Sequence, residues 1–169
     1  MKPTRFHLAQ ANVARMRGPL YSPIMEGFRS QLDRINAIAD SSPGFVWRLQ
    51  TDEGNATAIR AYEDDRILFN MSVWESFETL RDYVYRSDHA GPLRNRREWF
   101  EPLEGPILVL WWIPAGHIPS IEEAKAHLAM LKSRGPTADA FTFRAPFPPP
   151  GERRRPPPDI DAEFCEWAT

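Results

Sequence analysis

Residues 67–86 read ILFNMSVWESFETLRDYVYR, and this stretch decides the fold. Its first eight residues, 67–74, are apolar on both faces, which is typical of a buried strand. Ser76 then has the position of an N-cap, and apolar residues recur at helical spacing over 77–86. The stretch therefore predicts a strand that turns directly into an amphipathic helix.

The flanking sequence predicts the other elements from apolar periodicity, turn residues and caps. We expect strands over 6–13, 45–50, 67–74, 107–113 and 140–144, helices over 23–39, 77–86 and 121–133, and a short helix within 93–100. Residues 56–62 either extend the second strand or form a short strand of their own. The order β-α-β-β-α-β followed by α-β predicts an α+β fold, a ferredoxin-like core with an added helix and strand.

One face of such a sheet needs a cover beyond its two core helices. The strands 67–74 and 107–113 are apolar on both faces. An exposed apolar sheet face marks an interface. We therefore expect a homodimer in which a second subunit packs against this face.

Length and composition bound the class of protein. The 169 residues fit one domain over 1–151, followed by a proline- and arginine-rich tail over 152–169. A net charge of -2 argues against nucleic-acid binding, and a single cysteine excludes an internal disulfide. No apolar run approaches the roughly 20 residues of a membrane helix, and no signal peptide is visible. We expect a soluble, cytoplasmic protein without a membrane partner.

Polar candidates for a site gather after the helix 77–86, in the segment SDHAGPLRNRREWF over 87–100. His89 is the first candidate for proton transfer or metal ligation, because an imidazole titrates near neutrality. It could instead close the helix C-terminus. His7, on the first strand beside small residues, is the second candidate. Among the arginines of the segment we expect Arg97 to point inward and hold a carboxylate.

Tryptophans are the candidates for stacking on a planar ligand, with a core role as the alternative. Trp74 ends a strand, and Trp99 follows the arginines. Trp111 and Trp112 are adjacent on one strand and must face opposite sides. We assign Trp111 to the pocket and its neighbour to the dimer interface, although the pattern also permits the reverse.

Four stretches carry a resemblance to a known family: FHLAQANVAR, MSVWESFETLRDYVYRSDHAGPLRNRREWF, LWWIPAGHIPSIEEAKAHL and GPTADAFTFRAPFPPPG. Over residues 5–151 the chain resembles an uncharacterised domain family of the dimeric α/β-barrel superfamily, related to the antibiotic-biosynthesis monooxygenases. The superfamily includes cofactor-free oxygenases of aromatic polyketides, heme-degrading oxygenases, other heme-dependent enzymes and cyclases. Their sites commonly lie in a pocket between sheet and helices.

The resemblance implies ligand contacts for Asn12 and Trp74. It also places the heme-ligating histidine of the heme-degrading members near Leu93 or Arg94. The nearest histidine here, His89, lies about one helical turn earlier, so the chain departs from that pattern. Heme held through His89 stays open, as does the absence of any cofactor.

The sequence thus leads to three hypotheses. The first is monooxygenase-like oxidation of an aromatic or apolar biosynthetic intermediate, either cofactor-free or heme-dependent. The second is a non-catalytic ligand-binding dimer. The third is a cyclase or isomerase acting on a biosynthetic intermediate.

Overall fold

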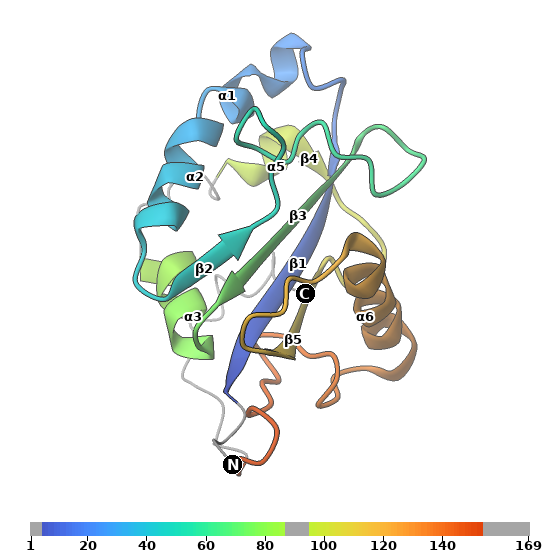
Figure 1. The fold of residues 1–169 in the computed structure, drawn as a ribbon. Helices are drawn as coiled ribbons and strands as arrows, with labels where there is room; N and C mark the ends of the chain where they lie inside the picture. Colours follow the sequence, from blue (N-terminus) through green and yellow to red (C-terminus); the bar gives the residue numbers. More distant parts are fainter. Residues whose placement is uncertain (1–4, 87–94, 154–169) are drawn as a thin grey trace.

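A computed structural model describes residues 5–86 and 95–153 of the chain (Figure 1). Its elements are β1 (Phe6–Met16), η1 (Pro23–Met25), α1 (Glu26–Arg29), α2 (Leu32–Ser41), β2 (Phe45–Arg48), β3 (Ile67–Trp74), α3 (Phe77–Arg86), α5 (Arg96–Trp99), β4 (Phe100–Glu101), β5 (Leu108–Pro114) and α6 (Ile121–Arg134). None of the helices in these ranges is long and apolar enough to span a membrane.

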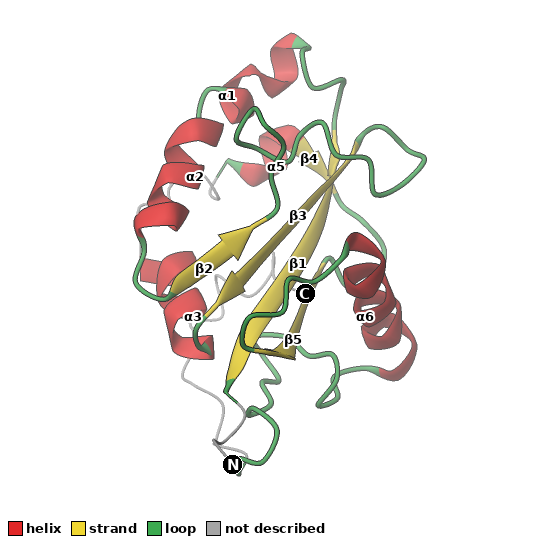
Figure 2. Cartoon of the chain, viewed as in Figure 1, coloured by secondary structure: helices red, strands yellow, loops and turns green. Residues whose placement is uncertain are grey.

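The sheet is antiparallel and is built around β1 (Figure 2). On one side β1 pairs with β3, which pairs with β2. On the other side β1 pairs with β5 and, near its end, with β4. Leu8 of β1 thereby lies between Trp74 of β3 and Trp112 of β5. This topology confirms the expected α+β, ferredoxin-like fold.

The two faces of the sheet are covered differently. The face that carries Leu8, Gln10 and Asn12, here called the helical face, packs against α3 and the α1–α2 segment. The opposite face, which carries Ala9 and Ala11, is here called the α6 face. Its core joins strand residues to residues of α6 and of the 140s: Val13, Phe69, Met71, Val73, Val109, Trp111, Ile113, Ala124, Leu131 and Ala140.

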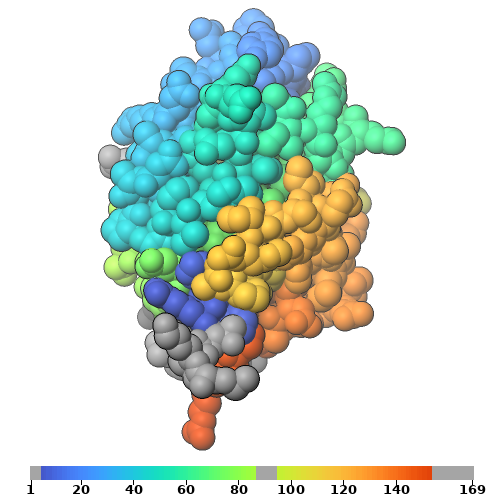
Figure 3. All heavy atoms as spheres, in the orientation of Figure 1, coloured from blue at the N-terminus to red at the C-terminus, as the bar shows by residue number. Residues whose placement is uncertain are grey.

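The α6 face is closed within a single chain. Ala9, Met71 and Val73 are fully buried without a second subunit. The space-filling view, in the orientation of Figure 1, shows the orange atoms of the α6 region packed against neighbouring segments of the chain (Figure 3). The expectation that a second subunit covers this face is therefore wrong, because the added helix α6 lies across β1 and β5 and supplies the cover.

The expected single helix over 23–39 is interrupted. It consists of η1, α1 and α2, with a break at Ser30, whose hydroxyl donates to the carbonyl of Gly27 over 2.9 Å. Gly27 lies against the indole of Trp99, which a Cβ at this position would approach to 3.2 Å. The small Gly27 thus allows this segment to pack closely against α5.

Two further predictions, for segments at the edge of the sheet, differ from the structure. The predicted strand 140–144 is reduced to two isolated bridges. Ala140 pairs with Thr137, and Phe141 exchanges backbone hydrogen bonds of 2.8 and 2.9 Å with Leu110. The chain then enters PFPPP, whose prolines have no N–H to continue a ladder. Residues 56–62 form turns rather than a strand. The strands 45–50, 67–74 and 107–113 and the helices 77–86 and 121–133 are confirmed within one or two residues.

Candidate functional site

A cavity of about 180 Å³ lies between the helical face of the sheet and the segments α1, α2 and α5. We call it the asparagine cavity, because four asparagines line it. Its polar wall residues are Asn12, Asn36, Asn55, Thr57, Asn70 and Arg96. Its other walls are mainly aliphatic and aromatic side chains from the sheet and helices: Phe28, Leu32, Ile35, Leu49, Leu68, Phe69, Trp99, Phe100, Ile107 and Leu108. Such a mixture of apolar walls and a few polar groups is typical of a small-molecule site.

The strand register places two asparagines side by side in the cavity floor. Asn12 of β1 is paired with Asn70 of β3. Asn70 is exposed although it lies mid-strand on a covered face. The helices therefore leave a hollow above this pair, and a ligand in that hollow meets amide groups rather than carboxylates.

Arg96 is the one charged residue that lines this cavity within the described ranges. Its guanidinium carbon lies 5.9 Å from the ring centre of Phe100. Burial lowers the pKa of Arg96, because an apolar surrounding disfavours the charged form. A guanidinium held in such a place favours an anionic or strongly accepting group on a ligand.

Trp99 forms the aromatic wall beside Arg96. It is 6% exposed, and its ring centre lies 6.0 Å from that of Phe28. Arg96 and Trp99 are three residues apart in α5 and so share one side of its single turn. This arrangement agrees with the expectation that Trp99 faces a pocket.

The arginine assignment within this segment needs a correction. Arg97, which we expected to point inward, is exposed and does not line the cavity. Trp99 is buried, so the helix turn directs the residue three positions earlier inward and Arg97 outward. Arg96 takes the predicted place, and the spacing Arg-x-x-Trp was the signal that could have identified it.

Neither histidine candidate is found among the described residues that line the cavity. His89 and Arg94 lie outside the described ranges. His7 lies on the α6 face, opposite the cavity, where β1 pairs it with Ile113. Its Nδ1 is buried and has no hydrogen-bond partner within the described part of the chain.

Two predicted stacking tryptophans are core residues that line neither cavity described here. Trp74 is fully buried and stacks on Tyr83, with ring centres 4.9 Å apart. Trp111 faces α6, where it stacks on His127 at 4.8 Å and its indole N–H donates to Glu123 over 3.2 Å. Both are buried because the sheet is covered on both faces, so neither assignment to the ligand wall is supported by the geometry.

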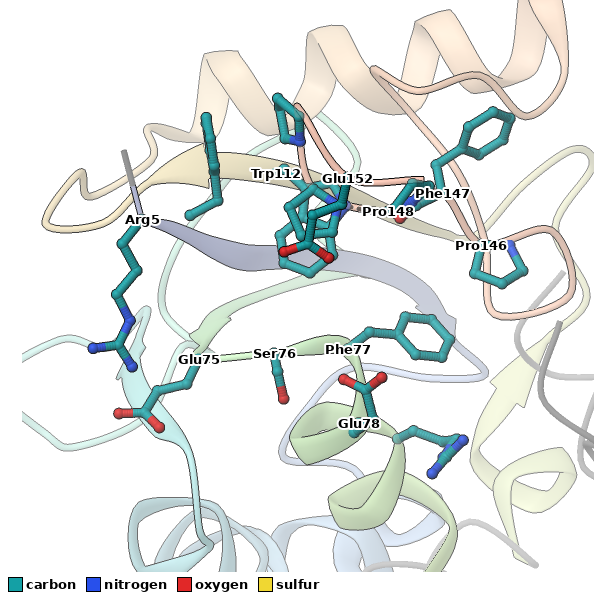
Figure 4. Close-up of a pocket in the computed structure, with 14 residues that line it drawn as sticks. Arg5, Glu75, Ser76, Phe77, Glu78, Trp112, Pro146, Phe147, Pro148 and Glu152 are labelled. Atoms are coloured by element: carbon teal, nitrogen blue, oxygen red, sulfur yellow. Dashed lines mark hydrogen bonds between the residues drawn. The ribbon is translucent and has the colours of Figure 1, made fainter. Parts of the chain in front are cut away.

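Trp112, rather than Trp111, faces a cavity. This second cavity, of about 400 Å³, lies between the start of α3 and the proline segment 146–150 (Figure 4). The indole N–H of Trp112 donates to the carbonyl of Phe147 over 2.8 Å, which holds the proline segment against the sheet. Glu78 on α3 and Glu152 beyond the prolines lie on opposite sides of the opening (Figure 4). Sequence analysis missed this cavity, because its walls come from distant parts of the chain.

The described walls do not fit heme. Heme iron is held by histidine, cysteine, methionine or tyrosine, and none of these occurs among the described residues that line the two cavities. No cluster of metal-ligating side chains occurs in residues 5–86 and 95–153. The histidine expected as a ligand, His89, lies outside these ranges.

The topology and the cavity define a class: an α+β, ferredoxin-like protein with a cavity between sheet and helices. The chain belongs to the family described as "Domain of unknown function (DUF3291)", whose model matches residues 7–156. This confirms the domain family on which the sequence resemblance rests. No curated protein matches the sequence.

Solved structures of similar fold include oxygenases. A mutant of SnoaB, described as a cofactor-independent oxygenase from Streptomyces nogalater, is 16% identical, with a TM-score of 0.44 and coverage of 66% of this chain and 95% of that chain. A putative antibiotic biosynthesis monooxygenase from Chloroflexus aurantiacus J-10-fl is 16% identical, with a TM-score of 0.37 and coverage of 68% and 98%. The NE2512 protein of unknown function from Nitrosomonas europaea is 8% identical, with a TM-score of 0.42 and coverage of 70% and 99%.

Proposed function

We propose that this chain is a small-molecule enzyme that carries out a monooxygenase-like, cofactor-free oxidation of a hydroxyaromatic intermediate in the asparagine cavity. The observation that carries the proposal is the composition of the cavity wall. Apolar and aromatic side chains surround a floor of amides, and Arg96 supplies one half-buried positive charge. An aromatic ring with an ionisable hydroxyl matches each of these features.

Each wall group has a role in this proposal. Trp99 and Phe28 pack on the ring, and Asn12 and Asn70 orient its polar substituents. Arg96 stabilises the phenolate, because an opposite charge in an apolar site favours the ionised form. His89, which lies outside the described residues and is chosen from the sequence alone, accepts the phenolic proton in this proposal.

The oxidation needs no outside reductant for a substrate whose ring contains an activated CH₂ group. The deprotonated substrate donates electrons to O₂, and the CH₂ becomes a carbonyl. One oxygen atom enters the product, and the other leaves as water with the two hydrogens of the CH₂. The protein contributes binding, deprotonation and exclusion of bulk water.

The test compares two variants with the same substitution. Ala56 lines the cavity, whereas Ala58 is exposed and does not. Ala56→Phe should fill the cavity and abolish oxygen uptake with a panel of hydroxyaromatic CH₂ compounds, and Ala58→Phe should leave it unchanged. Oxygen electrode traces and product mass spectra after ¹⁸O₂ labelling are the measurements. Equal uptake by both variants would place the reaction elsewhere and refute the proposal.

One observation favours a second function, ligand binding without catalysis. Among the described residues, the cavity wall contains no group that titrates near neutrality. A carrier would bind the same aromatic compounds and release them unchanged, with no oxygen uptake. A product formed without oxygen uptake would instead indicate a cyclase or isomerase.

A further inference from the structure

A row of four polar side chains runs through the helical face from the cavity into the core. We call Asn12, Gln10, Ser72 and Trp74 the polar row. Asn12 Nδ2 donates to Gln10 Oε1 over 3.2 Å, Gln10 Nε2 donates to Ser72 Oγ over 3.0 Å, and Trp74 Nε1 donates to Ser72 Oγ over 2.9 Å. The row thus joins a cavity residue to a tryptophan that does not line the cavity.

The row is built into the sheet. Gln10 and Ser72 are directly paired across β1 and β3. Asn12 is two residues from Gln10, and Trp74 is two residues from Ser72, so all four side chains lie on one face. Gln10 is 5% exposed, Ser72 is 7% exposed and Trp74 is fully buried. Water therefore does not replace these hydrogen bonds.

The hydrogen bonds of the row have one direction in the structure. An indole N–H only donates, so Ser72 Oγ accepts from Trp74. Ser72 Oγ also accepts from the Gln10 amide nitrogen, which turns the Gln10 carbonyl toward Asn12. The Asn12 nitrogen donates to that carbonyl. The Asn12 carbonyl oxygen is then the group left to face the cavity.

Reversal of the Asn12 amide is disfavoured while the Gln10 nitrogen remains bonded to Ser72. It would set two carbonyl oxygens, Asn12 Oδ1 and Gln10 Oε1, against each other. The strand β5 offers no alternative donor beside them, because its residues opposite Gln10 and Asn12 are Leu110 and Leu108. A buried polar group without a partner is destabilising, so the reversed amide is the less stable arrangement.

We infer that Gln10, Ser72 and Trp74 are positioning residues that hold Asn12 as a hydrogen-bond acceptor toward the cavity. The inference rests on the proposed function and specifies its substrate class: the ligand presents a hydroxyl or N–H donor to Asn12. A ligand of the same shape with a methoxy group at that point is discriminated against. Trp74 acts through this row and not by touching the ligand.

The first experiment needs no ligand. The side-chain amide resonances of Asn12, assigned by their loss in Asn12→Ala, are followed by ¹⁵N NMR. Ser72→Ala should shift them and accelerate their exchange with water. Trp74→Phe removes the N–H while keeping an aromatic ring on Tyr83, and it should act in the same direction. Ser72→Thr keeps the hydroxyl and should restore the wild-type resonances, whereas Ser133→Ala, at an exposed serine of α6, should change nothing.

The second experiment measures selectivity between 2-naphthol and 2-methoxynaphthalene. The wild type should bind the naphthol more tightly than the methoxy compound. Ser72→Ala should reduce the ratio of the two affinities about two- to ten-fold, because one hydrogen bond contributes about that much to binding. The affinity for the methoxy compound should not change, which separates loss of positioning from general damage to the cavity.

The two experiments test the positioning role and the proposed ligand class independently of each other. Unchanged Asn12 resonances in Ser72→Ala and Trp74→Phe would overturn the positioning role. Suppose instead that the Asn12 resonances respond as expected but neither naphthalene compound binds. The positioning role would then stand. The selectivity for a donor group and the proposed binding of hydroxyaromatic compounds would both be rejected.

Discussion

The imidazole of His117 lies 2.8 Å from the carboxylate of Glu123, at the point where the chain leaves β5 and enters α6. The other oxygen of that carboxylate accepts from the indole of Trp111 over 3.2 Å. The backbone N–H of Glu123 in turn donates to Ser120, the N-cap of α6. One carboxylate thus fastens the first turn of α6 to the sheet.

The Glu123 contact predicts an acid-sensitive stability. Burial alone would raise the pKa of Glu123, but hydrogen bonds from His117 and Trp111 outweigh it and lower the pKa. A lowered pKa contributes stability above the unfolded value of about 4.3 and loses it as the pH falls through the folded value. Glu123→Gln should therefore cost about 1 kcal/mol at pH 7 and much less at pH 3.

Urea unfolding of the wild type and the variant at both pH values measures this effect. Glu122→Gln is the matched control, because the side chain of Glu122 is 86% exposed. Parallel pH dependence in the Glu123 and Glu122 variants would contradict the prediction.

The Gly44 turn before β2 predicts a second stability effect. Gly44 has a φ of 79°, and a Cβ there would overlap the side chain of Thr79. Gly54 has a similar φ of 82°, with no atom within 4 Å of its Cβ position. Gly54→Ala should show only the backbone cost, about 1–2 kcal/mol, and Gly44→Ala should lower the melting temperature further. Equal melting temperatures of the two variants would mean that the Thr79 side chain and α3 move aside without loss of stability.

The two adjacent arginines of α5 predict opposite effects on anion binding. Arg96→Met should weaken the binding of 2-naphthoate about ten-fold or more, because a charged hydrogen bond is lost from an apolar site. Arg97→Met should leave it unchanged, since Arg97 is exposed. Fluorescence titration provides both dissociation constants, and a larger effect of Arg97→Met would reverse the assignment.

The cavity walls predict the response to hemin. Neither cavity contains a described histidine, cysteine, methionine or tyrosine. Addition of hemin should therefore produce only the broad absorption of unligated hemin. A sharp Soret band in the wild type that shifts in His89→Ala would instead identify a heme protein with histidine ligation.

The family resemblance predicts a homodimer, which the single chain does not test. Sedimentation equilibrium should give a mass of 39 kDa, twice the 19.5 kDa of one chain. Such a dimer has to use a surface other than the α6 face, because that face is already covered. A mass of 19.5 kDa at all concentrations would contradict the dimer.

Local sequence patterns were sufficient to predict those elements whose residues interact mainly with near neighbours in the chain. The strand–cap–helix unit over 67–86 was predicted and is confirmed, with Ser76 accepting from the Thr79 N–H as the cap of α3. Local patterns failed at 23–39, where Trp99 packs on Gly27 and the helix breaks. For the candidate site, Asn12 and Trp99 lie in the predicted cavity, but the choice between Arg96 and Arg97 depended on which side of a single turn is buried.

The sequence by itself determined the ferredoxin-like order of elements and the position of the asparagine-bearing strand, because apolar periodicity and caps act within a few residues. Only the tertiary structure decided which face each tryptophan occupies. Trp111 lies under α6 and Trp112 lies against the proline segment, because partners far along the chain select the faces. Only the tertiary structure could join Asn12 to Trp74, since strand pairing across 62 residues brings Gln10 to Ser72.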